Sequence, residues 1–168
     1  MVRLKALEPA GRSRFKADLQ EAFTTAAGEQ LGRAQEPIPS DHDIERSLDA
    51  PGAVAYDILV AGVVVGGAIV TVDVRNGRNS LDFLFIKTGQ HGQGFGQQAW
   101  RAIERQHSEA RIWETHTPYF EKRNIHFYVN RCGFKIVEYY IDGRSDHDDK
   151  HGVNSSEDEG MFRMEKRV

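Results

Sequence analysis

The spacing of apolar residues along the chain alternates between helix-like and strand-like stretches. Met1–Leu7 alternates as a short strand does, and residues 11–32 then repeat apolar side chains every three to four positions, as in an amphipathic helix. Two prolines interrupt this pattern. A shorter helix is predicted to follow Ser40, whose hydroxyl suits a helix N-cap, and to end near Pro51-Gly52.

Three strands joined by tight turns are predicted next. Two of them run near Val54–Val60 and Val63–Val74, and Ala61-Gly62 between them indicates a hairpin turn. Asn76-Gly77 is a strong hairpin signal that leads into a third strand at residues 80–87. The pattern therefore predicts an antiparallel sheet in the first half of the chain.

The next stretch combines the end of that strand with a glycine-rich turn, Gly89–Gly96, and a helix with an apolar face. The face consists of Phe95, Ala99, Trp100 and Ile103. The first amides of a helix lack intrahelical partners and the macrodipole adds positive charge there. Because glycines also let the backbone approach an anion closely, we expect this turn to bind a phosphate or pyrophosphate group.

The rest of the chain repeats the alternation of strands and helices. A short strand is predicted at Arg111–Thr115, a helix from Pro118 to about Cys132, and further strands at Phe134–Ile141 and Met161–Lys166. Antiparallel hairpins thus come first and a strand–helix–strand crossover follows. This order predicts an α+β fold with a mixed sheet.

Composition narrows the class of protein. The chain has 168 residues, 39% of them hydrophobic, and a net charge of −3, which fits a single domain over residues 1–168 and gives no reason to expect a nucleic-acid partner. Residues 53–74 are nearly long enough to span a membrane, but Asp57 and three glycines favour strands instead. The single cysteine, Cys132, excludes an internal disulfide and suits a reducing, cytoplasmic location.

The glycine turn allows more than one ligand. A nucleoside-triphosphate P-loop is excluded because no Gly-Lys-Ser/Thr follows the glycines. A dinucleotide fingerprint stays open as the alternative, since residues 94–99 satisfy G-x-G-x-x-A and Glu114 lies near the end of the next strand. That alternative predicts an NAD(P)-dependent oxidoreductase. Against it, hairpins rather than a repeated βαβ unit precede the motif.

Three segments carry a resemblance to a known family. The loop His91–Gly96, with the sequence HGQGFG, resembles the acyl-CoA pyrophosphate loop of the GNAT N-acetyltransferases, whose pattern is Gln/Arg-x-x-Gly-x-Gly/Ala. Residues 84–86 resemble that family's fourth strand. Asn124 and the Phe127-Tyr128…Gly133-Phe134 run resemble its later N…FY…GF segment, although Tyr128 lies five residues before Gly133 instead of four.

The resemblance implies a fold, a co-substrate and a binding site. The fold would be a mixed, mostly antiparallel sheet of six to seven strands flanked by about four helices. Acetyl-CoA would bind with its pyrophosphate on the loop amides and its pantetheine arm along the fourth strand, where that strand splays from the fifth. The implied binding residues are Phe85, Ile86, Lys87, His91, Gly92, Gln93, Gly94, Phe95, Gly96, Gln97 and Asn124.

The same resemblance implies acetyl transfer to an amine by direct attack on the thioester. The amine must be neutral, so a general base or an ordered water is needed, and Asp82 and Glu114 are the candidate carboxylates. Tyr128 is the candidate general acid for the departing thiolate. Cys132 is interpreted as a packing residue. A catalytically inactive acyl-CoA-binding module, and a homodimer as in many GNAT domains, stay open.

Two features of the surface bear on the acceptor. Residues 142–160 contain seven acidic and two basic residues, and such a segment either walls the acceptor site in favour of a cationic amine or is simply solvated. Four histidines, His116, His126, His147 and His151, are interpreted as solvated loop residues, and no metal is expected.

Overall fold

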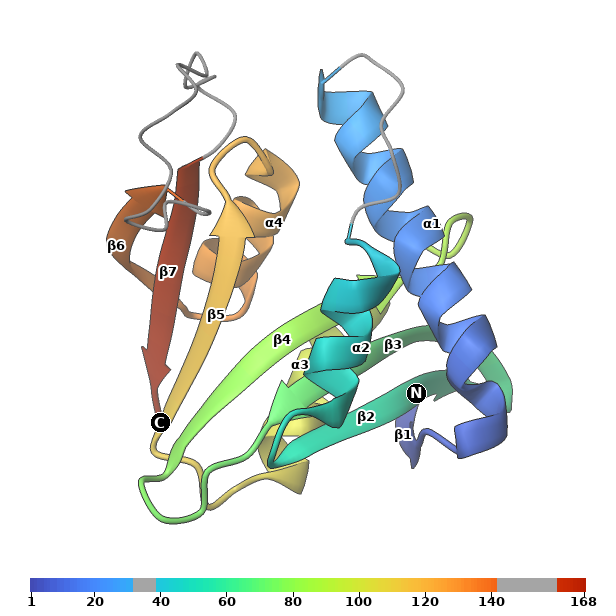
Figure 1. Cartoon of the computed structure of the whole chain (residues 1–168), viewed down its shortest axis with the longest axis horizontal. Coiled ribbons are helices and arrows are strands. Elements are labelled where there is room, and N and C mark those ends of the chain that lie inside the picture. The colour runs from blue at the N-terminus through green and yellow to red at the C-terminus, as the bar shows by residue number, and fades with distance from the viewer. Residues whose placement is uncertain (32–38, 142–159) are drawn as a thin grey trace.

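The computed structural model describes residues 1–31, 39–141 and 160–168, and its backbone is built around one sheet (Figure 1). The strands are β1 (Val2–Ala6), β2 (Ala53–Val60), β3 (Val63–Thr71), β4 (Arg78–Ile86), β5 (Ile112–Pro118), β6 (Lys135–Ile141) and β7 (Gly160–Arg167). The helices are α1 (Arg12–Leu31), α2 (Asp41–Asp49), α3 (Phe95–Gln106) and α4 (Lys122–His126), with a 3-10 helix η1 (Pro9–Gly11) and a π-helix η2 (Phe127–Arg131).

The seven strands lie in the order β1-β2-β3-β4-β5-β7-β6. Every neighbouring pair is antiparallel except β4 and β5, which are parallel and are connected through α3. The expected α+β fold with a mixed, mostly antiparallel sheet is therefore confirmed. The parallel pair arises because a crossover helix returns the chain to the same end of the sheet.

Local signals in the sequence produce the turns and caps that were predicted from them. Ala61 and Gly62 both have positive φ, +50° and +78°, as the hairpin between β2 and β3 requires. The Ser40 hydroxyl accepts a hydrogen bond from the Asp43 amide at 3.2 Å and so caps α2. The Ser40 contact satisfies an amide that the first turn of α2 leaves without a partner in the helix.

The two faces of the sheet carry separate clusters of buried side chains. On one face α3 packs through Trp100 against Trp113 of β5, with ring centroids 5.2 Å apart. On the other face α1 and α2 cover β2–β4 (Figure 1), and Phe15 of α1 contacts Phe85 of β4 edge-to-face at 5.4 Å. Burying both faces fixes the register of the strands, because a one-residue slip would invert every side chain.

The stretch at residues 53–74 forms β2 and β3, as its glycines and β-branched residues indicated. Asp57 within it is buried and accepts two hydrogen bonds from Arg14 of α1, at 3.0 and 2.9 Å. This pair of charges ties α1 to the sheet. Across the described ranges, no helix combines the length and the apolar character that crossing a membrane would require.

Two predicted boundaries are wrong. The strand predicted to reach Val74 ends at Thr71, because the Asp73 carboxylate accepts bonds from the amides of Arg75 and Asn76 and forms a turn. The helix predicted to begin at Pro118 begins at Lys122, and Pro118 belongs to β5. Beyond Thr115, β5 has only β7 as a neighbour, and a strand with one free edge tolerates proline.

Candidate active site

The parallel pair of strands opens part of the way along its length. β4 and β5 are paired only from Arg78↔Ile112 to Leu81↔Thr115. β4 then continues to Ile86 against β3, and β5 continues to Pro118 against β7, so the two strands diverge (Figure 1). Each therefore presents one unpaired backbone edge to the opening. This is the splay that the sequence resemblance implies.

A side chain terminates the ladder where the strands separate. The Thr115 hydroxyl donates a hydrogen bond to the Leu81 carbonyl at 2.9 Å, and Thr115 is 2% exposed. In a continuing ladder that carbonyl would accept from a backbone amide of β5. The hydroxyl therefore takes the place of that amide, and no backbone pairing between β4 and β5 follows it.

The glycine-rich loop leads directly into the N-terminus of α3. Gly94 occupies the N-cap position with φ of +74°, and the first helical bond is donated by Gln98 to the Gly94 carbonyl at 3.1 Å. The amides of residues 95–97 precede that bond and so have no partner within the helix. The first turn contains no acidic side chain, and His91–Gly94 are exposed. An anion would meet free amides and the positive end of the dipole here.

Two predicted binding residues have structural contacts of their own. A Cβ on Gly96 would lie 3.4 Å from the Phe127 ring, so the start of α3 packs closely against η2 at this residue. The Gln97 side-chain amide donates to the Arg131 carbonyl at 3.0 Å. Both contacts join the loop end of α3 to the segment that carries Tyr128.

The three residues predicted to bind the pantetheine arm, Phe85, Ile86 and Lys87, have different contacts in the structure. Phe85 directs its ring into the cluster with α1, and Ile86 is the last residue of β4. The Lys87 amide donates to the Val65 carbonyl at 2.8 Å and the Lys87 carbonyl accepts from the Gln90 amide at 2.9 Å. The backbone of Lys87 is thus already bonded on both sides. Asn124 lies in α4 and is half-buried.

The extra residue between Tyr128 and Gly133 is absorbed by η2. The Cys132 amide donates to the Phe127 carbonyl at 3.0 Å, five residues back, instead of the four of an α-helix. A π-turn accommodates one inserted residue without rotating the helix on either side of it. Tyr128 therefore faces the sheet despite the spacing that departs from the family pattern.

Tyr128 is enclosed by apolar groups and one hydroxyl. Its ring lies 5.3 Å from that of Phe127 and 5.7 Å from that of Phe134, and it is 6% exposed. Burial raises the pKa of the phenol far above its ordinary value and the neighbouring Cys132 adds to the rise, whereas a hydrogen bond with Thr115 lowers it. The phenol is therefore protonated at neutral pH and can serve as a proton donor.

Cys132 has the properties of a packing residue. It is buried, and burial raises the pKa of its thiol to about 12. A thiol with that pKa contributes almost no thiolate at neutral pH, and the thiolate is the nucleophilic form. Cys132 is thus unsuited to a covalent mechanism.

Asp82 occupies a bulge in β4. Phe83 pairs with Ile69 and Leu81 pairs with Val70, so Asp82 between them is the extra residue. Its carboxylate accepts hydrogen bonds from the hydroxyls of Thr71, at 2.6 Å, and Ser80, at 2.8 Å. Burial raises the pKa of Asp82, and these two bonds offset only part of the rise.

Glu114 and His116 lie on the face of β5 opposite Thr115, because side chains alternate along a strand. Both act on Asp82: the charge of His116 lowers the pKa of the Asp82 carboxyl and that of Glu114 raises it. Arg163 of β7 donates to Glu114 at 3.1 Å. The structure thus brings Asp82 and Glu114 together, but Glu114 already has a cationic partner.

His116 and His126 are exposed, as expected, but their placement in loops is wrong. His116 lies in β5 and its Nδ1 is 2.8 Å from the Tyr140 hydroxyl of β6, while His126 ends α4 with its Nδ1 2.7 Å from the Asn130 side-chain amide. His147 and His151 lie outside the described residues, as does the acidic segment up to residue 159. Within the described ranges, no three His, Cys, Asp or Glu side chains gather as a metal site requires.

Tyr128 and Asp82 consequently approach the opening from different faces of the sheet. Tyr128 and Thr115 lie on the α3 side, and Asp82, Glu114 and His116 are grouped on the other. Sequence reasoning missed Thr115 and His116. The available signal was the alternation Trp113, Thr115, Thr117, which places two hydroxyls on the face that a tryptophan marks as core.

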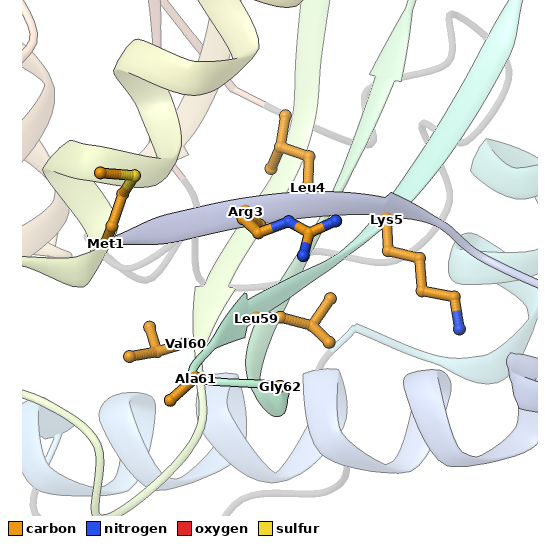
Figure 2. A pocket seen from close by; sticks show the side chains of 8 residues that line it. All are labelled: Met1, Arg3, Leu4, Lys5, Leu59, Val60, Ala61 and Gly62. Carbon is orange, nitrogen blue, oxygen red and sulfur yellow. The ribbon is translucent and has the colours of Figure 1, made fainter.

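A cavity of about 700 Å³ lies away from this opening, beside β1 at the edge of the sheet (Figure 2). Arg3, Leu4 and Lys5 of β1 line it together with the turn at Ala61 and Gly62. None of the sequence-predicted site residues borders it. The opening between β4 and β5, which the predicted residues do border, is therefore the candidate site.

Comparison with known proteins gives concordant results. Residues 15–134 match the Acetyltransferase (GNAT) family. The protein YrkN of Bacillus subtilis (strain 168) is 47% identical over 161 residues, which cover 90% of this chain and 85% of that protein. A Bacillus subtilis acetyltransferase solved in complex with CoA superposes with a TM-score of 0.72 at 19% identity, covering 100% of this chain and 99% of that one.

A spermidine N-acetyltransferase from Vibrio cholerae, solved in complex with CoA and spermine, superposes with a TM-score of 0.68 at 14% identity, covering 99% of this chain and 95% of that one. At such identities the likeness concerns the fold.

The fold and the family match together define the class of the protein as an acyltransferase. The chain belongs to the GNAT family of acetyltransferases. The dinucleotide alternative is not supported, because its glycine motif lies in a sheet with a single parallel pair and Glu114 is bonded to Arg163.

Proposed function

We propose that the protein transfers the acetyl group of acetyl-CoA to an amine, which attacks the thioester directly. The observation that carries the proposal is the conjunction of a free helix N-terminus with an opened parallel strand pair. The amides of residues 95–97 would hold the pyrophosphate. The unpaired edge of β4 would bond to the pantetheine amides as a further strand does.

We assign the role of base to Asp82. An alkylamine with a pKa near 10.4 is neutral in only roughly four molecules in 10,000 at pH 7, a deficit of about 4.6 kcal/mol. A carboxylate whose pKa is raised by burial is a stronger proton acceptor than an ordinary one. Glu114 is the weaker candidate, because its carboxylate already accepts a hydrogen bond from Arg163.

We assign the role of acid to Tyr128. When the C–S bond breaks, the thiolate of CoA requires a proton, and the Tyr128 phenol lies beside Thr115 at the point where the strands separate. Amine attack from the side of Asp82 and thiolate protonation from the side of Tyr128 would keep the two proton transfers apart. No covalent intermediate with the protein is required.

We infer that the acceptor is a cationic amine. Residues 142–160, which connect β6 to β7 in the sequence, contain seven acidic and two basic residues. An excess of carboxylates attracts a positively charged substrate. A polyamine fits this charge, as does a lysine side chain of a protein.

The test is a CoA-release screen with acetyl-CoA against polyamines, aminoglycosides, amino acids and peptides. A thiol reagent can report the released CoA, because the buried Cys132 contributes little background. We expect turnover with at least one cationic amine. Tight acetyl-CoA binding without turnover on any amine would instead indicate an inactive acyl-CoA-binding module.

A further inference from the structure

β1 is an edge strand, and its outer backbone edge has no partner strand. Within the described ranges, β1 ends the strand order and pairs only with β2. The Leu7 amide donates to the Ala55 carbonyl at 2.9 Å, so the backbone of Leu7 faces β2. Successive residues of a strand direct their amide and carbonyl groups to opposite edges, so those of Leu4 and Ala6 face away from β2. Such an edge can pair with another strand.

Two hollows border β1. The larger, of about 700 Å³, lies between β1 and the end of β2 with the turn that follows it (Figure 2). The smaller, of about 290 Å³, lies between β1 and the last turn of α3, where Arg105 and Gln106 line it. Arg3 and Leu4 line both hollows, which therefore adjoin at the middle of β1. A chain that lay along the edge would have room for its side chains.

The hollows are bordered by positive charge. Arg3 and Lys5 line the larger and Arg105 the smaller, and none of the described residues that line either one is acidic. Arg3 and Arg105 are exposed, and neither has an ion-pair partner in the described part of the chain. Lys5 lies 3.9 Å from Glu8 in an exposed pair, which contributes little. This edge of the sheet thus attracts a negatively charged partner.

The side chains of β1 alternate between two environments. Leu4 packs against the cluster of buried side chains that includes α3, whereas Arg3 and Lys5 are exposed. Figure 2 shows Leu4 and Lys5 leaving the strand on opposite sides. A strand that paired with β1 would alternate in step with it. Apolar side chains would then lie beside Leu4, and acidic side chains beside Arg3 and Lys5.

The charges of β1 oppose its pairing with a second copy of the same strand. Antiparallel pairing centred on Leu4 would place Arg3 of each copy opposite Lys5 of the other, and like charges directly opposite each other are destabilising. Charged side chains protect edge strands against self-association in this way. The same charges favour a strand of opposite sign.

We propose that β1 binds an extended acidic segment of another protein as an additional strand of the sheet. The outward amide and carbonyl of Leu4 form main-chain hydrogen bonds with this segment, and Arg3 and Lys5 select acidic residues at alternate positions. Arg105 lines the same hollow as Arg3 and attracts the same carboxylate. β2 and β3 separate β1 from β4, so a partner docked here leaves the opening between β4 and β5 accessible.

The binding experiment titrates the full chain into a fluorescent peptide of alternating glutamate and valine. The peptide is blocked at both ends and carries no amine, so it cannot accept an acetyl group. We expect Arg3→Glu and Arg105→Glu each to weaken binding about three- to tenfold. Arg46→Glu is the matched control and should bind as the wild type. Arg46 is exposed in the last turn of α2, as Arg105 is in that of α3, but lines neither hollow.

Modified peptides separate strand pairing from attraction between charges alone. A peptide with glutamine in place of glutamate should bind at least about tenfold more weakly. Methylation of one alternate set of peptide amides should abolish binding, because those amides face β1, whereas methylation of the other set should leave binding unchanged.

Hydrogen exchange measured by NMR locates the contact on the protein. The Leu4 amide should exchange rapidly in the free chain and slowly with the glutamate–valine peptide bound. The Lys5 amide faces β2 and serves as the internal control, since it should be protected in both states.

Several results would overturn the proposal. They are no binding of the glutamate–valine peptide, equal binding of the two methylated peptides, a loss in Arg46→Glu equal to that in Arg105→Glu, and a Leu4 amide that is already protected in the free chain. Chemical shift changes confined to the opening between β4 and β5 would also overturn it, because the peptide would then occupy the candidate active site. None of these measurements uses acetyl-CoA, so they are independent of the proposed acetyl transfer.

Discussion

At the level of single residues, Asp82, the proposed base, shows how a fold keeps a buried carboxylate at a cost in stability. A bulge in β4 holds the carboxylate out of the regular alternation, and two hydroxyls bond to it while burial raises its pKa. The pKa of such a group is higher in the folded protein than in the unfolded chain. Its contribution to stability is therefore largest at low pH, below the unfolded pKa, and is lost as the pH rises through the folded pKa. At neutral pH, the charged carboxylate therefore weakens the fold.

Asp82→Asn should consequently lower activity and raise stability. We expect kcat/KM at pH 7 to fall roughly 10²- to 10⁴-fold, the range for removal of a general base, and the acidic limb of the pH–rate profile to disappear. The free energy of unfolding at pH 7, measured with denaturant, should increase. An acidic limb that persists in Asp82→Asn and vanishes in Glu114→Gln would move the role of base to Glu114.

His107 contributes a pH dependence of stability that has no connection with the active site. Its Nε2 lies 2.8 Å from the buried Tyr56 hydroxyl, and burial lowers the pKa of the imidazole, while Glu109 raises it by a smaller amount. The lowered folded pKa means that the neutral ring stabilises the fold above the unfolded pKa of about 6.5. This stabilisation is lost as the pH falls below that value towards the folded pKa.

Denaturant unfolding at pH 7.5 and pH 5.5 should reveal this effect. The wild type should lose more stability between the two values than His107→Gln, by up to about 1.4 kcal/mol per unit of pKa difference. His42, which is exposed on α2, provides the control substitution. Equal losses in the wild type and His107→Gln would contradict this assignment.

At the level of elements, the loop before α3 illustrates how backbone conformation prepares a site. Gly94 ends the loop with a positive φ, which directs the chain into a helix whose first amides are free. The tight turn between β2 and β3 uses the same conformation at Gly62 for a purely structural purpose. Space for a Cβ is open at both positions, so they form a matched pair.

Gly94→Ala and Gly62→Ala should have similar effects on stability and different effects on acetyl-CoA. Each alanine would occupy a left-handed conformation at a cost of about 1 kcal/mol. Only Gly94→Ala should raise the KM for acetyl-CoA, by roughly three- to tenfold, because the loop amides shift. Steady-state kinetics measure KM, and thermal unfolding measures stability. An equal rise of KM in Gly62→Ala would contradict the assignment of the loop to acetyl-CoA binding.

The π-helix η2 is the second element whose function depends on backbone geometry. On a regular helix, the extra residue before Gly133 would rotate Tyr128 by about 100°. The bond from Cys132 back to Phe127 absorbs that residue, and Tyr128 remains beside Thr115. The spacing of residues in the sequence does not reveal this compensation, because a backbone hydrogen bond produces it.

At the level of the whole molecule, the sheet consists of two parts with a narrow connection. Four residue pairs join β4 to β5, and beyond them the strands on either side are separate. A ligand bound along the opening would contact both parts. We therefore expect acetyl-CoA to stabilise the whole molecule against unfolding.

Acetyl-CoA at 100 times its Kd should stabilise the protein by about 2.7 kcal/mol. For a chain of this size, that corresponds to an increase in Tm of roughly 5–10 °C. NAD and NADP at the same concentration serve as controls and should leave Tm unchanged. An equal shift with the dinucleotides would contradict the assignment of the opening to an acyl-CoA.

Local patterns in the sequence determined most of the elements and the loop that is proposed to bind the acetyl donor. Hairpin signals, the Ser40 cap, the apolar face of α3 and the glycines after β4 each act through neighbouring residues, so their consequences can be predicted from the chain. The loop after β4 was predicted to bind phosphate for the same reason: its glycines and the helix it begins are contiguous in sequence.

The proposed catalytic arrangement depends on the tertiary structure. Where β4 separates from β5, how far Asp82 is buried, and which hydroxyl Tyr128 meets all depend on contacts between residues distant in sequence. The extent of β5 through Pro118 depends on the loss of a neighbouring strand, which no local signal encodes. Burial and pairing are properties of the assembled sheet, and they set the protonation states on which the proposed chemistry depends.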